Sequence, residues 1–278
     1  TGSSQRSSSE PKGTAMVDYE RTKWVPGGTD PEVVLFFIHG VGGSLDVWRS
    51  QLEFFSQQGY ETIAVDLLGH GDSSAPKVAA AYTFYALSKE VTYIFMKYAG
   101  RTNVLIGHSY GTSFCIYLAH NYPERVHKMV LLSGGPPRPL WPCYRLLSSL
   151  SSCVLSCLFP LLRWYFLKAG FAHRGSREVR LLNDHKAFSV SPFVLRSVMQ
   201  GQYWPEADRR YHAQVAAPTL LIYGVHDEFV TIDDGIEMAT TLPNASLKIV
   251  EEGGHMLMIE CPDLVNSIMN EFFLMDHE

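Results

Sequence analysis

The sequence has few charged residues and no excess of positive charge. Asp, Glu, Lys and Arg make up 18% of its 278 residues, and the net charge is −5. This net charge and a pI near 6.1 argue against nucleic acid as the main partner, so we expect no nucleic-acid partner. Hydrophobic residues make up 46% of the sequence, which is enough for a sizeable core.

Cysteine is also scarce, and its spacing fits no common site. The five cysteines include no C-x-x-C pair, so they indicate neither a disulfide framework nor a zinc site. No P-loop, no H-E-x-x-H motif and no cluster of Cys and His ligands occurs in the sequence. We therefore expect no metal and no cofactor. A reducing compartment and the lack of a signal segment in this sequence predict a cytoplasmic protein.

One short motif organises the rest of the sequence, Gly107-His108-Ser109-Tyr110-Gly111. It follows the apolar run Val104–Ile106, which is typical of a buried parallel strand, and it precedes a segment with helical periodicity. A strand that turns into a helix this sharply holds the apex residue in strained backbone geometry. Gly107 and Gly111 are needed because a Cβ would clash there. Ser109 is therefore the candidate nucleophile.

Apolar runs alternate with amphipathic segments on both sides of this motif. They predict strands at 33–38, 61–66, 103–107, 128–133, 218–224 and 247–250. Helices are expected over 45–58, around 84–98 and from Pro262 onward. The last of these should turn four side chains inward, Leu264, Ile268, Met269 and Phe272. This alternation indicates an α/β fold with right-handed crossovers and a mostly parallel central sheet flanked by helices.

The alternation breaks in the middle of the chain and divides it into segments. We expect a disordered or extended tail over 1–30 and the first half of the core over 31–139. The stretch 140–214 is mainly helical and rich in aromatic residues, whereas 215–278 completes the core. The insert is thus a helical lid between two halves of one sheet, on the side where the strands' carboxyl ends bind ligands.

A run of 17 residues without charge, Leu146–Leu162, lies in this lid. A membrane span needs about 20 mostly apolar residues, and here five serines and Pro160 interrupt the run, which disfavours a span. We expect a lid helix, and we leave open a peripheral contact of Leu146–Leu167 with a membrane surface or a protein. Cys153 and Cys157 share one helix face, which fits small apolar packing or, alternatively, reversible acylation.

A serine nucleophile needs a base beside it and an acid that orients the base. Asp227 follows the strand that ends at Gly224, and His255 follows the last strand, so the order along the chain is Ser, Asp, His. This order suits a nucleophile in the middle of a parallel sheet. Both residues lie in loops at strand ends, where distant parts of the chain converge.

Other roles for these two residues stay open. Asp227 also suits the N-cap of a helix that starts near Thr231, and His255 is one of 11 histidines. His39 and His70 lie in turns, where structural hydrogen bonds are expected. Three further acids are rivals of Asp227: Glu228, Asp233 and Asp234.

Acyl transfer also needs donors for an oxyanion. The backbone N–H of Tyr110, directly after the nucleophile, is one, and that of Val41 in His39-Gly40-Val41-Gly42-Gly43 is the other. Each such donor typically contributes ~3 kcal/mol to the transition state. A dinucleotide-binding role for this turn is excluded, because the third glycine of that motif would fall at Leu45.

Taken in order, these motifs resemble the α/β-hydrolase fold family over about residues 31–275. They are the His39-Gly40 turn, the Asp66-x-x-Gly-His-Gly71 loop, the elbow at Ser109, Asp227 and Gly254-His255. The resemblance implies a Ser109–Asp227–His255 charge-relay triad. Dehalogenase and epoxide hydrolase relatives carry Asp at the elbow, where this chain has Ser109. Acyltransferase relatives carry His-x4-Asp, but the matching segment here, His120-Asn-Tyr-Pro-Glu-Arg125, ends in arginine, so transferase chemistry is disfavoured.

Two hypotheses about function follow. The first is a serine hydrolase that acts on a hydrophobic small-molecule acyl substrate, an ester, thioester or lipid, through an acyl-enzyme. The second is a catalytically silent or regulatory protein of the same fold that binds a protein partner through its lid, since fold alone does not prove turnover.

Overall fold

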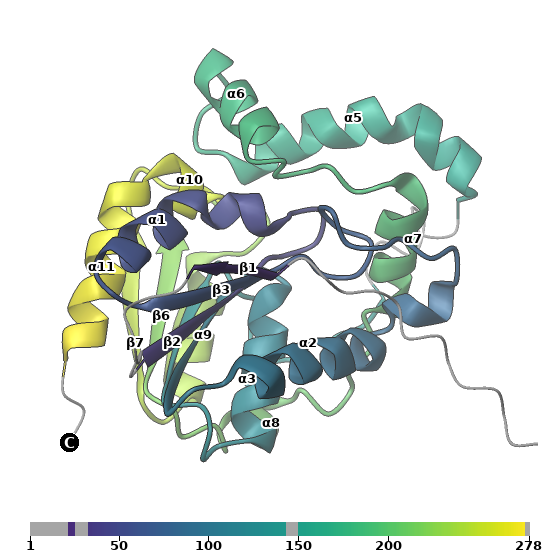
Figure 1. Cartoon of the computed structure of the whole chain (residues 1–278). Helices are drawn as coiled ribbons and strands as arrows, with labels where there is room; N and C mark the ends of the chain where they lie inside the picture. Colours follow the sequence, from purple (N-terminus) through teal and green to yellow (C-terminus); the bar gives the residue numbers. More distant parts are fainter. Residues whose placement is uncertain (1–21, 26–32, 143–149, 276–278) are drawn as a thin grey trace, which may run out of the picture.

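The computed structural model describes residues 22–25, 33–142 and 150–275. Seven strands form one sheet in the order β1-β3-β2-β4-β5-β6-β7 (Figure 1). Their bounds are β1 Thr22–Val25, β2 Val33–Ile38, β3 Glu61–Val65, β4 Thr102–His108, β5 Lys128–Leu132, β6 Thr219–Gly224 and β7 Ala245–Val250. Strands β2 to β7 are parallel. The predicted, mostly parallel sheet is therefore confirmed.

Strand β1 pairs with β3 in the antiparallel direction at the edge of the sheet. We did not predict it, because it lies in the segment 1–30 that was expected to be a disordered or extended tail. The remainder of that segment falls outside the described residues.

Helices cover both faces of the sheet, as expected for a parallel sheet. One face packs on α2 (Phe84–Tyr98), α3 (Gly111–Asn121), α8 (Arg209–His212) and α9 (Ile232–Thr241), and the other on α1 (Arg49–Gln57), α10 (Leu257–Glu260) and α11 (Pro262–Leu274). Successive residues of β2 point to opposite faces, so Phe36 joins the first hydrophobic core and Phe37 the second. Two short 3-10 helices, Leu45–Trp48 and Ala79–Tyr82, precede α1 and α2.

The final helix buries a different side chain from the one predicted at its start. Leu264 is 50% exposed, whereas Val265 is buried. Val265, Met269 and Phe272 stand at positions i, i+4 and i+7, so they share the face of α11 that packs on the core. Ile268 packs at the margin of that core.

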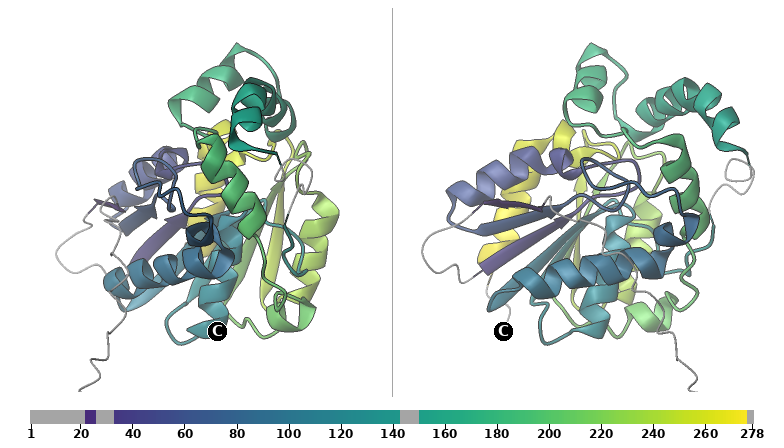
Figure 2. Two further views of the ribbon diagram at one scale, coloured as in Figure 1. Left: turned by 90° about the vertical axis from the view of Figure 1, so that its right-hand side faces the viewer. Right: turned by 45° about the vertical axis from the view of Figure 1, so that its right-hand side comes forward.

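The helical insertion lies between β5 and β6, as predicted, and it includes α5 (Ser152–Gly170), α6 (Ser176–Asp184) and α7 (Pro192–Gly201). Helices α5 and α6 lie at one end of the molecule in every view (Figures 1 and 2). The first residues of the uncharged run, Leu146–Ser149, fall outside the described residues. Side chains of α5 and α7 line the same cavity as Ser109, so the insertion covers the carboxyl end of the sheet as a lid would.

The cysteines of the described residues are free thiols, and two of them lie on α5. Cys153 and Cys157 are both exposed, so the interpretation of small apolar packing is wrong for this pair. Cys115 is buried beside the elbow. Cys143 lies outside the described residues.

Candidate active site

The nucleophile elbow has the strained geometry that its sequence predicts. Ser109 has φ of +52°, a left-handed conformation that residues other than glycine rarely adopt. Its N–H donates to the carbonyl of Leu132 at 2.9 Å, and its carbonyl accepts from the N–H of Thr112 at 3.0 Å. These bonds join the end of β4 to its neighbour β5 and to the start of α3, so they hold the apex in place.

The two glycines of the elbow are required by close approaches of the backbone. A Cβ on Gly111 would lie 2.2 Å from the carbonyl oxygen of Ile38. On Gly107 it would lie 2.7 Å from Sγ of Cys115. The steric argument for glycine two positions before and two after Ser109 is therefore confirmed.

Asp227 and His255 come together at the carboxyl ends of β6 and β7. Nδ1 of His255 donates to Oδ2 of Asp227 at 2.8 Å, and both side chains are buried. The other carboxylate oxygen accepts the N–H groups of Phe229 at 2.8 Å and Val230 at 3.0 Å. Burial alone would raise the pKa of Asp227, but the nearby His255 and these hydrogen bonds lower the pKa below its ordinary value. Asp227 is thus an ionised acceptor that orients the imidazole.

The rival roles for Asp227 and its neighbours are resolved by their contacts. Thr231 is the N-cap of α9, so the N-cap interpretation of Asp227 is wrong. Asp234 completes the capping box with Thr231. Glu228 is exposed and pairs with Arg174. Asp233 stands in the first turn of α9.

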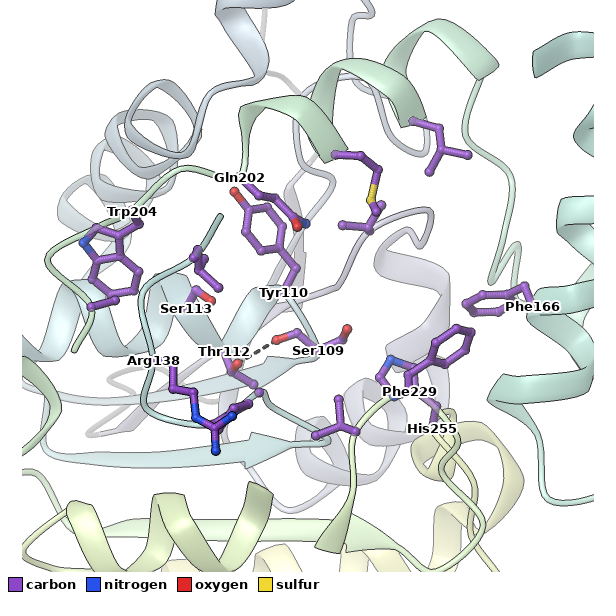
Figure 3. A pocket seen from close by; sticks show the side chains of 18 of the residues that line it. Ser109, Tyr110, Thr112, Ser113, Arg138, Phe166, Gln202, Trp204, Phe229 and His255 are labelled. Atoms are coloured by element: carbon purple, nitrogen blue, oxygen red, sulfur yellow. Dashed lines mark hydrogen bonds between the residues drawn. The ribbon is translucent and has the colours of Figure 1, made fainter. Parts of the chain in front are cut away.

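Ser109 and His255 line the same cavity, which has a volume of about 360 Å³. In Figure 3 the Ser109 side chain points toward the part of this cavity where His255 and Phe229 lie. No hydrogen bond joins the serine hydroxyl to the imidazole among the described residues. Hydrogen bonds of this kind commonly tighten only when substrate binds. The volume lies within the range of small-molecule sites.

The two proposed oxyanion donors also border this cavity. Val41 and Tyr110 line it beside Ser109. A Cβ on Gly40 would lie 2.8 Å from the Cβ of Ser109, so the turn after β2 closely approaches this serine. Within the described part of the chain, the N–H of Val41 makes no hydrogen bond. It is therefore available to a ligand.

His39 and His70 have the structural roles expected of them. Nε2 of His39 accepts the N–H of Leu67 at 3.0 Å, and Nδ1 donates to the carbonyl of Gly40. Burial lowers the pKa of His39 to about 4 and that of His70 to about 3, so both rings are neutral. No group of three or more His, Cys, Asp or Glu within the described residues is placed to hold a metal ion.

His108 has a role that the elbow motif alone does not reveal. Its Nε2 donates to the carbonyl of His255 at 2.8 Å, and the two rings lie 4.7 Å apart. Burial, followed by the nearby His255, lowers the pKa of His108 to about 3, so the ring is neutral. His108 therefore ties the loop of His255 to the nucleophile elbow.

Glu260 anchors the same loop from the other side, and sequence reasoning missed it. One carboxylate oxygen accepts the N–H of Gly254 at 2.9 Å, and the other accepts that of Ala172 at 2.8 Å. Gly254 precedes His255, whereas Ala172 follows the end of α5, so one buried side chain joins the two segments. A single acid within the apolar run from Met256 to Cys261 was the available signal, because a buried acid needs partners.

Aromatic rings connect the lid to the site. Phe166 of α5 lies 5.7 Å from Phe229, which lies 5.1 Å from the ring of His255. Phe188 of the lid packs on Gly42, and the N–H of Ser189 donates to the carbonyl of Gly42 at 3.0 Å. The lid therefore contacts Phe229, which packs on His255, and the turn after β2.

The sequence profile of the α/β hydrolase fold matches residues 33–262. Together with the sheet order and the strained elbow, this match defines the class: the chain belongs to the α/β hydrolase fold family.

Among individual proteins, the chain is similar to a mammalian relative over its whole length. The chain is 52% identical over its whole length to Protein ABHD8 of Bos taurus, and it spans 64% of the length of that relative. The pairing of Tyr82-Thr-Phe-Tyr85 with Gly201-Gln-Tyr-Trp-Pro205 in the sequence also resembles this relative. In the structure these segments pack together, with Phe84 stacked on Trp204 at 4.3 Å.

More distant relatives include hydrolases. The chain is 27% identical over 260 residues to 2-hydroxy-6-oxononadienedioate/2-hydroxy-6-oxononatrienedioate hydrolase of Burkholderia vietnamiensis, and it covers 88% of that protein with 88% of its own length. The enol-lactonase of Burkholderia xenovorans has a similar solved structure, with a TM-score of 0.78, 21% identity, and coverage of 94% of this chain and 99% of that one. This structural likeness shows the fold.

Proposed function

We propose that the chain is a serine hydrolase that cleaves ester-like or thioester-like acyl substrates. His255 removes the proton from Ser109, whose oxygen attacks the acyl carbonyl. The N–H groups of Val41 and Tyr110 stabilise the oxyanion, and His255 then gives the proton to the leaving group. Water attacks the acyl-enzyme in the same way and regenerates the free serine.

One observation carries this proposal: the Asp227–His255 hydrogen bond lies beside the cavity that a strained Ser109 also lines. Because Nδ1 of His255 is used by Asp227, Nε2 is the nitrogen left to accept a proton. The depressed pKa of Asp227 keeps a negative charge behind the ring. That charge stabilises the imidazolium that forms when the serine is deprotonated.

The cavity walls favour an apolar acyl group. The walls are built mostly from apolar side chains of the core and the lid, among them Ile116, Leu140, Leu155, Leu162, Phe166, Leu195, Met199, Trp204 and Met238. Polar side chains also border the cavity, among them Thr112, Ser113, Arg138 and Gln202 (Figure 3). An apolar chain would displace water from this space at little cost, which favours a hydrophobic acyl substrate.

A panel of p-nitrophenyl esters of increasing acyl length tests this function. We expect hydrolysis by the wild type that rises with chain length until the cavity is filled. The rate should fall by on the order of 10³ or more in Ser109→Ala and in His255→Ala. Hydrolysis that persists in Ser109→Ala would remove Ser109 from the role. No hydrolysis of any ester, with a cellular effect that survives Ser109→Ala, would instead support the silent, partner-binding alternative.

A further inference from the structure

Helix α5 is apolar on two sides, but only one side is covered. Leu155, Leu162 and Phe166 face the cavity. The opposite arc is exposed and apolar or thiol-bearing, and it consists of Cys153, Val154, Cys157, Pro160, Leu161 and Trp164. Leu161 and Trp164 are each 57% exposed. A helix that is apolar on all sides is normally buried, so this outer face lacks a partner among the described residues.

The helix is long and apolar enough to cross a membrane, but its contacts place it on a surface instead. The window Cys153–Gly170 has a mean hydropathy of 1.2 and is 17% buried. Its inner face covers the cavity, and Gly170 at its end accepts the N–H of Met256, next to His255. A spanning orientation would break these contacts and would bury Arg163. In Figures 1 and 2, α5 lies across one end of the molecule with its outer side uncovered.

The side chains around α5 are mostly basic, so they favour binding to an anionic surface. Residues 150–180 contain five basic side chains and one acidic one, although the whole chain carries a net charge of −5. The acid, Glu178, is buried at the start of α6. Lys168 lies over the ring of Trp164 at the end of the exposed arc, and Arg180 is exposed on α6. One of the five basic residues, Arg174, forms an ion pair with Glu228, which lies outside this segment.

We propose that the outer face of α5 docks on an anionic phospholipid bilayer. Leu161 and Val154 enter the acyl boundary, and Trp164 lies at headgroup depth, where aromatic rings are favoured. Lys168 and Arg180 face the anionic headgroups. The docked helix brings the cavity of Ser109 to the lipid surface. Docking does not depend on catalysis, so this proposal is independent of the proposed hydrolysis.

Vesicle flotation of the full chain tests this surface. The Ser109→Ala protein, which removes any effect of turnover, is mixed with phosphatidylcholine vesicles that contain about one third phosphatidylserine. We expect it to float with the vesicles. The variant Leu161→Glu with Trp164→Glu should bind at least about tenfold more weakly, because each charge must enter the apolar boundary. Leu161 and Trp164 do not line the cavity.

Leu264→Glu is the matched control, since Leu264 is 50% exposed on α11. It should bind as the parent does. Circular dichroism checks that each variant is folded. If the double variant does not fold, Leu161→Gln replaces it and should lose about threefold relative to Leu264→Gln.

Three results would overturn the proposal. They are no flotation of the parent, equal flotation of the double variant, and flotation that is unchanged without phosphatidylserine or in about 0.5 M NaCl. Self-association that the double variant abolishes, in a protein that ignores vesicles, would assign the face to a second copy of the chain.

Discussion

Replacing Glu260 with Gln tests whether one buried carboxylate holds the loop of His255 in place. The side chain is about 5% exposed, and its two oxygens accept different N–H groups, those of Gly254 and Ala172. Glutamine has the same shape but only one acceptor oxygen. Its NH₂ group must therefore face one of these donors and leave it without a partner.

The expected effect is set by that one lost acceptor. An unsatisfied buried donor costs about 1–3 kcal/mol, so the free energy of unfolding should fall by that amount in urea titrations. If Gly254 is released, His255 shifts, and a displacement of roughly 1 Å can slow chemistry by on the order of 10². We therefore expect a fluorophosphonate probe to label Ser109 more slowly in Glu260→Gln by tenfold or more.

The stability that Glu260 contributes should depend on pH, in a direction set by the shift of its pKa. Burial is the main cause that raises the pKa of Glu260 above its ordinary value, and its hydrogen bonds only partly offset it. The stability that Glu260 contributes is therefore fully present below the ordinary pKa of Glu, about 4.3, and is lost as pH rises through its folded pKa. The stability difference between wild type and Glu260→Gln should thus be larger near pH 4 than near pH 8.

Glu178→Gln is the control for Glu260→Gln. Glu178 is also buried in the lid, but only one of its oxygens accepts a backbone N–H, that of Gly175. Glutamine can preserve that bond, so stability and labelling should change little. Wild-type labelling in Glu260→Gln, or an equal loss in Glu178→Gln, would refute the anchoring role of Glu260.

The remaining predictions concern the elbow, the turn and the acid. Gly42→Ala should lose about 2–3 kcal/mol and slow labelling by tenfold or more, because φ is +82° and a Cβ would lie 2.8 Å from the ring of Phe188. Gly59→Ala, with φ of +90° and open space, should lose only about 1 kcal/mol and label normally. If Gly42→Ala labels as fast as Gly59→Ala, the close packing of Phe188 on Gly42 does not matter for the site. Asp227→Asn should slow labelling by on the order of 10³. Because the pKa of Asp227 is lowered, its stabilisation is present above about pH 4 and is lost as pH falls through its folded pKa, so the stability difference from Asp227→Asn should shrink in acid urea titrations. His108→Leu should cost about 1–3 kcal/mol by leaving the carbonyl of His255 unpaired, with partial recovery in His108→Gln; no recovery would point to packing instead.

The sequence predicts those features of the fold that depend on local patterns. Apolar runs located the six parallel strands to within two residues at each end, because a strand buried on both faces is apolar along its whole length. Strand β1 has no such run, since it is an edge strand that only pairs with β3. Leu264 was misplaced by one residue on α11, and a one-residue shift is enough to turn a side chain from core to solvent.

In the candidate site, too, the sequence predicts features that depend on neighbouring residues but not contacts between segments far apart in the chain. The glycines around Ser109 are dictated by clashes within a few residues, and the order of Ser109, Asp227 and His255 by the topology of the sheet. The anchoring by Glu260 depends on Ala172, which is 88 residues away in the chain. Phe188 meets Gly42 only because the lid folds back on the turn after β2. Contacts of this kind leave no periodic pattern, so only the structure reveals them.

Mapping the covalent adduct of a fluorophosphonate probe tests the central claim most directly. The folded full chain is labelled, digested and analysed by mass spectrometry, beside Ser109→Ala and His255→Ala. We predict one adduct, on the peptide that contains Ser109, absent from Ser109→Ala and slowed by on the order of 10³ in His255→Ala. An adduct on another residue, or labelling of Ser109 at the wild-type rate without His255, would contradict the proposed partnership of the two side chains.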